Sequence, residues 1–291
     1  MYKCVGLNMR NLDQFRKLNK AKNDFNTLNR DFFEVYDSCN FAQQIFLRHR
    51  VKLLKNDSRY IGYIWTELDD INVYTINALN ILNTEKNSNK YLLFKYLLDT
   101  LKKNCNINYN CEKNSYNFDI LKHMGFIQKE GTFVLHLSIE ENMPLLIMEN
   151  LEFEILKKGR DEQKRCELQN DIFKNEDRIP LSIEDIYLDE VQTYYFDKGS
   201  VFIKKDGNYI GYGQVIIEDS VPVIVNFGIL KESRGKGYSK ALLVYLIKII
   251  KYNGFSDVMI KVKTSNKIAL NLYESTGFKI INEIYNWKLK T

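Results

Sequence analysis

The chain has 291 residues, with 42 Lys and Arg against 37 Asp and Glu for a net charge of +5. Hydrophobic residues make up 45% and charged residues 27%, which excludes general disorder, and at roughly 150 residues per domain the length predicts two domains. The small, dispersed charge excess argues against a nucleic-acid partner, and the longest apolar run is too short to span a bilayer, so no membrane partner is expected. The N-terminus lacks the long apolar segment of a secretory signal.

The five cysteines are scattered and show no metal-ligand spacing. Cys105 and Cys111 have five residues between them, more than a zinc hook allows, and the three histidines are unpaired as well. Five is also an odd number for a disulfide framework. We therefore expect free thiols in a reducing, cytoplasmic location, and no metal site.

In chain order, the first elements that recur are a hairpin and a helix. The string Tyr-Ile-Gly-Tyr occupies residues 60–63 and again 209–212, an offset of 149, each time after an apolar run and an Asp-containing turn. This pattern is typical of a β-hairpin. Apolar residues at helical spacing then predict helices at 91–103 and 241–251, an offset of 150.

A third landmark closes each half of the chain. Asn114 precedes a Gly-Phe pair at Gly125 by eleven positions, and Asn266 precedes Gly277 in the same way, at an offset of 152. Each intervening segment is predicted to be a short helix that a glycine ends. Three landmarks in one order at a nearly constant offset indicate an internal repeat.

The repeat predicts two homologous domains, residues 1–143 and 144–291, joined near 140–143. Each domain mixes strands and helices, so we expect an α/β fold in which a mostly antiparallel mixed sheet is flanked by helices. The elements predicted for the second domain are strands at 152–156, 200–205, 209–217, 221–230, 257–263 and 279–288, and helices at 161–174, 239–252 and 267–274.

A glycine-containing loop joins the strand at 221–230 to the following helix. It reads Arg234, Gly235, Lys236, Gly237, Tyr238, Ser239. Glycines permit positive φ, and loop amides at a helix N-terminus form a site for an anion such as pyrophosphate. Arg234 and Lys236 add positive charge, and Ser239 can cap the helix. The spacing fits neither a P-loop nor the dinucleotide fingerprint.

This loop resembles the R/Q-x-x-G-x-G/A signature of the GNAT family of N-acetyltransferases, with Ser239 where that family usually has Gly or Ala. A second family feature, N-x-x-A-x-x-L-Y-x-x-x-G-F, is matched by Asn266, Ala269, Leu272, Tyr273, Gly277 and Phe278. The resemblance covers most of the second half of the chain. It implies two tandem GNAT-like domains, of which the second is catalytic.

The resemblance also implies roles for particular residues. Acetyl-CoA would be the acyl donor, with its pyrophosphate on the loop amides and its pantetheine arm along the backbone of Ile229 and Leu230. Asn266 would contact the pantetheine region, and Tyr273 would protonate the CoA thiolate; the alternative for Tyr273 is a core tyrosine. The implied reaction is acetyl transfer to a primary amine, of a small molecule or a peptide, by direct attack.

The proton of the attacking amine has no clear acceptor in the sequence. An alkyl ammonium has a pKa of about 10.4 and must lose a proton before it attacks. Glu218 and Asp219 are candidate bases, although a solvated turn explains them as well, and Glu232 is expected at the surface. Two other functions stay open: a non-catalytic acyl-CoA sensor, and a transferase that uses charged tRNA, which the small net charge disfavours.

The first half has lost the residues of the site. The positions of the glycine loop align with Thr84, Glu85, Lys86, Asn87, Ser88 and Asn89. Leu121 takes the place of Tyr273. We therefore expect a degenerate first domain that shapes the acceptor pocket or serves as a packing partner. The oligomeric state is not predicted.

Overall fold

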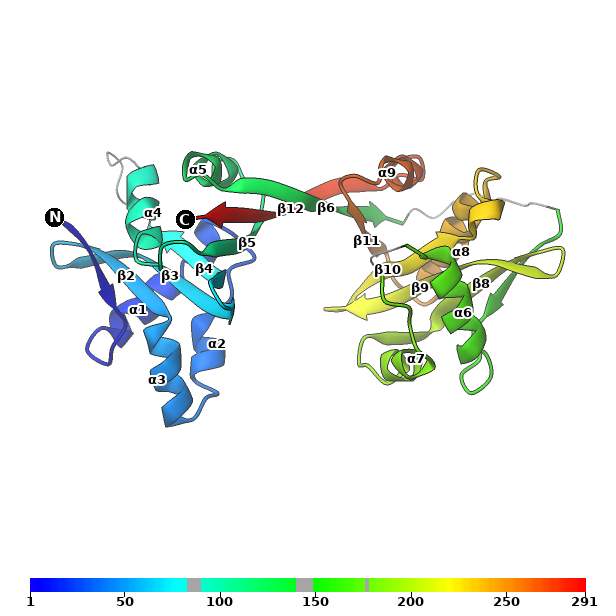
Figure 1. Cartoon of the computed structure of the whole chain (residues 1–291). Coiled ribbons are helices and arrows are strands. Elements are labelled where there is room, and N and C mark those ends of the chain that lie inside the picture. The colour runs from blue at the N-terminus through cyan, green and yellow to red at the C-terminus, as the bar shows by residue number, and fades with distance from the viewer. Residues whose placement is uncertain (83–89, 140–148, 176–177) are drawn as a thin grey trace. The chain divides into compact units, whose positions relative to one another are not determined.

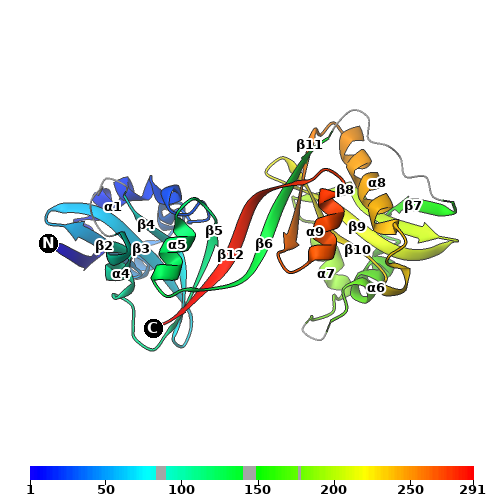
Figure 2. The ribbon, with the colours of Figure 1, turned by 90° about the horizontal axis from the view of Figure 1, so that it is seen from above.

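The computed structural model describes residues 1–82, 90–139, 149–175 and 178–291. They form two units (Figures 1 and 2): residues 1–132 with 282–291, and residues 133–281. The predicted junction at 140–143 lies outside the described residues. The units also differ from the predicted 1–143 and 144–291, because the strands β6 (Ile127–Ser138) and β12 (Lys279–Lys290) each begin in one unit and end in the other.

The first unit has the sheet order β1-β2-β3-β4-β5-β12. Neighbouring strands are antiparallel except for the parallel pair β4 and β5, and residues 284–290 of β12 pair with β5. Besides β12 and the first half of β6, the elements of this unit are β1 (Tyr2–Gly6), α1 (Leu12–Asn19), the 3₁₀ helix η1 (Lys22–Asp24), α2 (Phe32–Tyr36), α3 (Phe41–His49), β2 (Val51–Asn56), β3 (Arg59–Asp70), β4 (Val73–Ile81), α4 (Lys90–Leu98), β5 (Asn106–Glu112) and α5 (Asn117–His123).

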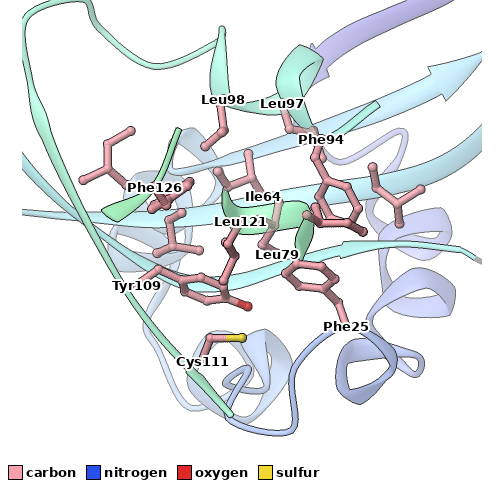
Figure 3. Close-up of a cluster of buried hydrophobic side chains, with 14 of the residues drawn as sticks. Phe25, Ile64, Leu79, Phe94, Leu97, Leu98, Tyr109, Cys111, Leu121 and Phe126 are labelled. Carbon is pink, nitrogen blue, oxygen red and sulfur yellow. The ribbon is translucent and has the colours of Figure 1, made fainter. Parts of the chain in front are cut away.

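Helices cover both faces of this sheet. Because successive side chains of a strand point to opposite faces, the adjacent Leu53 and Leu54 of β2 belong to different cores. Leu54 lies in one core with Phe94 of α4 and Leu121 of α5, both of which Figure 3 labels, and Leu53 lies in the other core with Phe15 of α1. Each face of the sheet therefore has its own hydrophobic core.

The second unit repeats this arrangement with the order β7-β8-β9-β10-β11, followed by the second half of β6. The predicted mixed α/β fold with a mostly antiparallel sheet is confirmed. Its elements are β7 (Leu151–Ile155), α6 (Glu162–Ile172), α7 (Ile183–Glu190), β8 (Tyr195–Lys205), β9 (Asn208–Glu218), β10 (Val221–Ile229), the 3₁₀ helix η2 (Lys231–Ser233), α8 (Tyr238–Tyr252), β11 (Asp257–Lys263) and α9 (Lys267–Glu274).

Two helix layers also flank the second sheet. Leu242 and Leu246 of α8, one turn apart, are fully buried with Val215 and Ile260 of the sheet, on the face that Figure 2 presents. On the other face, α6 packs against the sheet next to α7. Helix α7 was not among the predicted elements, although a capping box formed by Ser182 marks its start.

Candidate functional site

The sheet of the second unit opens between two parallel strands. β10 and β11 pair only at Val223 with Met259 and at Ile224 with Ile260. Just beyond, Asn226 has a φ of 49°, and the register of β10 against β9 shifts there. A cavity of about 260 Å³ fills the opening, and its walls are residues 224–227, residues 260–263, Phe173, Arg178, Asn266 and Tyr273. We call it the interstrand cavity.

Tyr273 lies on the wall of the interstrand cavity. Its side chain comes from the last turn of α9, is 6% exposed, and packs with ring centroids 6.2 Å from Phe227 and 6.1 Å from Phe278. Burial raises the pKa of its phenol to about 12. At neutral pH the hydroxyl therefore keeps its proton and is able to donate it in a hydrogen bond.

Asn266 joins Tyr273 at the same cavity. It is the N-cap of α9, and its side-chain oxygen accepts a hydrogen bond from the Ala269 amide at 3.1 Å. Because that oxygen is committed to the cap, the side-chain NH₂ is the group that this asparagine presents to a ligand. The structure thus brings together two of the predicted site residues, Asn266 and Tyr273, at one cavity.

The glycine loop leads from β10 to α8 as predicted. Gly235 and Gly237 have φ of 77° and 83°, in the left-handed region that favours glycine. Gly237 is the N-cap of α8, and no side chain caps the helix. The expected capping by Ser239 is therefore wrong, because Ser239 is already the second residue of the helix. The amides of the first turn keep the hydrogen-bonding capacity that an anion requires.

The charged residues of the loop donate hydrogen bonds to backbone carbonyls of β10, α6 and η2. Arg234 donates from Nε to the Ile229 carbonyl at 2.9 Å and from Nη2 to the Ile172 carbonyl at 3.0 Å. Lys236 directs its ammonium to the Glu232 carbonyl at 3.4 Å. Arg234 therefore holds the loop against the end of α6, and the backbone amides are the groups left for an anion.

The backbone that lines the interstrand cavity comes earlier in β10 than Ile229 and Leu230, the residues for which a coenzyme contact is predicted. The Leu230 amide donates to the Ile210 carbonyl of β9 at 2.8 Å, and the Ile229 carbonyl accepts from Arg234. Residues 224–227, and not Ile229 or Leu230, line the cavity. The bulge at Asn226 explains the difference, because it turns the strand away from β11 before those residues are reached.

None of the three candidate bases lines the interstrand cavity, although the partner of Glu218 is the wall residue Lys261. Glu218 forms an exposed ion pair with Lys261 at 2.9 Å, and Asp219 occupies the exposed turn between β9 and β10 with a φ of 48°. Glu232 is exposed in η2. All three carboxylates therefore have the environment of ordinary surface or turn residues.

A second cavity, of about 330 Å³, lies on the α6 and α7 side of the sheet. It shares Arg178 and Asn226 with the interstrand cavity, so the two meet at these residues. We call it the helix-side cavity. Its other walls are Arg165, Gln169, Leu181, Asp185, Ile186, Leu188, Asp189, Gln192 and Tyr194. None of these residues was predicted, although the capping box and the i, i+4 pair Asp185 and Asp189 are visible in the sequence.

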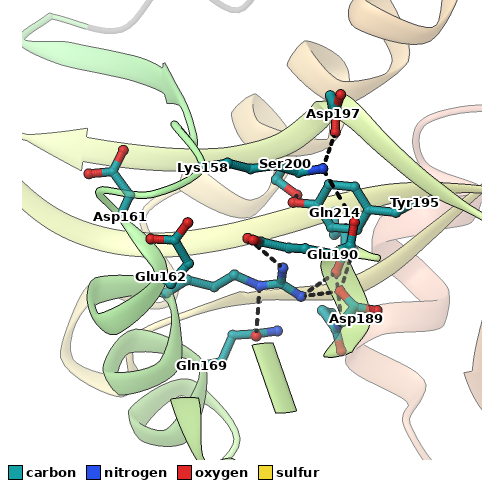
Figure 4. Close-up of polar contacts among 12 residues, drawn as sticks. Lys158, Asp161, Glu162, Gln169, Asp189, Glu190, Tyr195, Asp197, Ser200 and Gln214 are labelled. Carbon is teal, nitrogen blue, oxygen red and sulfur yellow. Dashed lines mark hydrogen bonds and ion pairs between the residues drawn. The ribbon is translucent and has the colours of Figure 1, made fainter. Parts of the chain in front are cut away.

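A buried polar network forms the floor of the helix-side cavity (Figure 4). Asp189 accepts hydrogen bonds from Arg165 at 2.5 Å, from Gln214 at 2.9 Å and from the Tyr194 hydroxyl at 2.9 Å. Gln214 in turn accepts from the Asn226 side chain at 2.9 Å. Burial opposes ionisation of Asp189, but the hydrogen bonds from Arg165 and Gln214 outweigh it and hold the pKa of its carboxyl below the ordinary value.

In the first unit, side chains close the corresponding opening. β4 and β5 pair only over Val73–Thr75. Beyond that point the buried Asn29 bonds both backbone groups of Leu79 in β4, at 2.9 and 3.2 Å. The buried Asn26 bonds the Asn110 carbonyl at 2.8 Å and the Glu112 amide at 3.0 Å in β5.

The Tyr109 hydroxyl links the two asparagines, at 2.9 Å from Asn26 and 2.8 Å from Asn29. The side-chain amides of Asn26 and Asn29 thus form hydrogen bonds with the backbone of β5 and β4 where these two strands separate. Leu121, at the position equivalent to Tyr273, is fully buried in the core. Residues 84–89, which align with the glycine loop, lie outside the described residues.

Comparison with known proteins extends these observations. Residues 165–278 match the model of the acetyltransferase (GNAT) family. The chain is 25% identical over 122 residues to a mycothiol acetyltransferase of Thermomonospora curvata, a match that covers 41% of each protein. It is 29% identical over 159 residues to an N-alpha-acetyltransferase of Sulfurisphaera tokodaii, covering 47% of this chain and 92% of that one. The match thus spans about two fifths of the mycothiol acetyltransferase.

Two solved structures show the same fold over the whole chain. A GCN5-related N-acetyltransferase from Sphaerobacter thermophilus aligns with a TM-score of 0.64 and 14% identity, covering 99% of this chain and 95% of that one. A tandem GNAT protein from the clavulanic acid biosynthesis pathway aligns with a TM-score of 0.54 and 11% identity, covering 100% and 98%. In the described parts of the chain, no helix has the length and apolarity to cross a membrane.

Proposed function

The chain belongs to the GNAT acetyltransferase family through residues 165–278, and from this premise we propose that its second unit transfers the acetyl group of acetyl-CoA to a primary amine. The observation that carries the proposal is the interstrand cavity, which has Tyr273 and Asn266 on its wall and opens beside the strand that leads into the glycine loop. The acceptor is proposed to be a small-molecule or peptide amine, and the location to be the cytoplasm.

The coenzyme would bind through backbone groups. Its pyrophosphate would accept hydrogen bonds from the amides of Gly235, Lys236, Gly237, Tyr238 and Ser239, with Arg234 holding the loop in place. Its pantetheine arm would lie along residues 224–227 and continue toward Ile229 and Leu230. The side-chain NH₂ of Asn266 would donate to a carbonyl of that arm.

Tyr273 would act on the sulfur. The neutral amine attacks the carbonyl carbon of the thioester, a C–N bond forms, and the C–S bond breaks to release the CoA thiolate. A thiol has an ordinary pKa of about 8.5, so a phenol with a pKa of about 12 first stabilises the thiolate by a hydrogen bond. The phenol protonates the sulfur as it regains a proton, through water, from the acetylated nitrogen.

Release of the CoA thiol on a panel of amines tests this proposal. Turnover of any amine, together with coenzyme binding measured by calorimetry, supports the transferase. Coenzyme binding without turnover of any amine would instead support the alternative of a non-catalytic acyl-CoA sensor. A chain that binds no coenzyme contradicts both.

We propose further that the first unit is a degenerate copy that binds no coenzyme. Asn26 and Asn29 satisfy the strand backbone that a pantetheine arm would need, and Leu121 has no hydroxyl. The test uses the full chain, because residues 282–291 complete the first unit. We expect calorimetry to give one coenzyme per chain, and a stoichiometry of two would contradict the proposal.

A further inference from the structure

We propose that the helix-side cavity binds the acceptor, and that this acceptor is a small zwitterion, a primary amine that also carries a carboxylate, as a free amino acid does. This inference rests on the proposed function, in which the thioester occupies the interstrand cavity. It goes further in naming the chemical class of the acceptor and the residues that select it.

The position of the helix-side cavity suits an acceptor. It meets the interstrand cavity at Asn226 and Arg178, so an amine seated beside Asn226 would face a thioester held near Tyr273. The Asn226 side chain is fixed by its hydrogen bond to the fully buried Gln214, which also bonds Asp189. The boundary between the two cavities is therefore fixed at Asn226.

One wall of this cavity is anionic. Asp185 and Asp189 lie one helical turn apart on α7 and both face the cavity. Arg165 compensates Asp189 by an ion pair at 2.5 Å. Asp185 accepts its hydrogen bonds from Ser182 within the capping box and has no basic partner among the described residues. It is therefore the carboxylate available to an ammonium group.

The opposite charge comes from Arg178, which lines both cavities. Its guanidinium lies 4.9 Å from the centre of the Phe173 ring, and no carboxylate of the described residues pairs with it. Nearby, the buried Gln169 keeps an NH₂ group without a hydrogen-bond partner in the described part of the chain. These donors favour a ligand that brings oxygen acceptors to this side, as a carboxylate does.

The pair of opposite charges separates three classes of amine. A diamine would place an ammonium group against Arg178, and an amine with two acidic groups would place one of them against Asp185. A zwitterion satisfies both. Leu181, Ile186 and Leu188 supply the apolar part of the walls, which favours an apolar side chain. Leucine is therefore a suitable probe.

The test compares leucine with leucinamide, which has the same side chain and a primary amine but no carboxylate. We expect the wild-type chain to release CoA thiol with leucine, and the ratio of kcat/KM for leucine to that for leucinamide to fall about tenfold in Arg178→Gln, the equivalent of about 1.4 kcal/mol. Arg178→Lys, which keeps the charge, should restore part of the ratio. Asp185→Asn, which preserves the cap, should lower kcat/KM for both amines alike.

Other outcomes overturn the inference. Three results would each reject a zwitterionic acceptor. The first is an equal loss of kcat/KM for leucine and leucinamide in Arg178→Gln. The others are a preference of the wild type for the diamine cadaverine and a loss of CoA affinity in Arg178→Gln. In those cases thiol release with some amine still supports the proposed function. Coenzyme binding without release on any amine rejects the proposed function instead.

Discussion

Arg234 donates a hydrogen bond to the carbonyl of Ile172 over 3.0 Å, and this contact joins the glycine loop to the last residue of α6. Carbonyls at the end of a helix have no partner within it and carry the negative end of the helix dipole, so a guanidinium suits them. The glycine loop and the helix that lines the helix-side cavity are therefore joined by one side chain.

Arg234→Ala should weaken coenzyme binding even though the guanidinium reaches no phosphate in our proposal. The loop amides lose their fixed position, and we expect the Kd for CoA in calorimetry to rise about tenfold or more. Arg234→Gln, which retains a donor, should lose less. If Arg234→Ala instead left the Kd unchanged, the contact with Ile172 would have no role in presenting the loop.

Gly235→Ala tests the loop conformation. A Cβ at Gly235 would meet no atom within 4 Å, so the cost comes from its φ of 77° alone, about 1–2 kcal/mol. Gly254 is a matched control, because it follows the other end of α8 with a φ of 88° and equal space. We expect both variants to lower the melting temperature and only Gly235→Ala to weaken CoA binding.

Tyr273→Phe should separate catalysis from binding. Loss of the hydroxyl would remove the proposed hydrogen bond to the leaving sulfur, and we expect kcat to fall about 100-fold while the Kd for acetyl-CoA changes little. Tyr245→Phe serves as the control, since Tyr245 stacks on Phe153 at 4.1 Å away from the cavity. Equal losses of rate and affinity in Tyr273→Phe would point to a packing role.

Asn29→Ala should destabilise the first unit alone. It leaves the backbone of Leu79 and the Tyr109 hydroxyl without this partner, which we expect to cost about 3 kcal/mol of unfolding free energy. Both tryptophans, Trp65 and Trp287, belong to this unit, so their fluorescence in urea follows it selectively.

The control for that measurement is Asn106→Ala, an exposed position on β5. It should leave the urea midpoint nearly unchanged. In Asn29→Ala the Kd for CoA should stay that of the wild type, because the proposed site lies in the second unit. A changed coenzyme stoichiometry would argue that the first unit takes part in binding.

Asp161→Asn should change how stability depends on pH. Hydrogen bonds from the Arg160 guanidinium, together with that from the Lys157 amide, lower the pKa of the Asp161 carboxyl to about 2. A depressed pKa stabilises the fold above the unfolded value of about 3.9, and this contribution is lost as pH falls toward 2.

Urea unfolding followed by circular dichroism between pH 6 and pH 2 measures this effect. We expect Asp161→Asn to be less stable than the wild type at pH 6 and the difference to shrink below pH 4, as the Asp161 carboxyl of the unfolded wild-type chain takes up a proton while that of the folded chain stays ionised. A difference that stays constant over the whole range would show that the variant acts through packing.

The sequence predicted the recurring hairpin, helix and Gly-Phe landmarks, and the strand order of the first unit does recur in the second. It also predicted that Asn266 and Tyr273 belong to one site, which the interstrand cavity brings together. It missed α7, although the capping box of Ser182 marks the start of that helix, and it did not locate the backbone that lines the interstrand cavity, because the bulge at Asn226 has no local signature.

The sequence by itself determined features that lie within single short segments. Glycine is required where the loop adopts positive φ at positions 235 and 237, and Asn266 caps the helix that carries Tyr273. Such requirements act between near neighbours and can be recognised in a linear pattern.

Only the tertiary structure decided the partners of Arg234, the meeting of two cavities at Asn226 and Arg178, and the closing of the first unit's opening by Asn26 and Asn29. It also decided that β6 and β12 each continue from one unit into the other. These features depend on contacts between residues far apart along the chain, where many partners are chemically equivalent and packing alone selects among them.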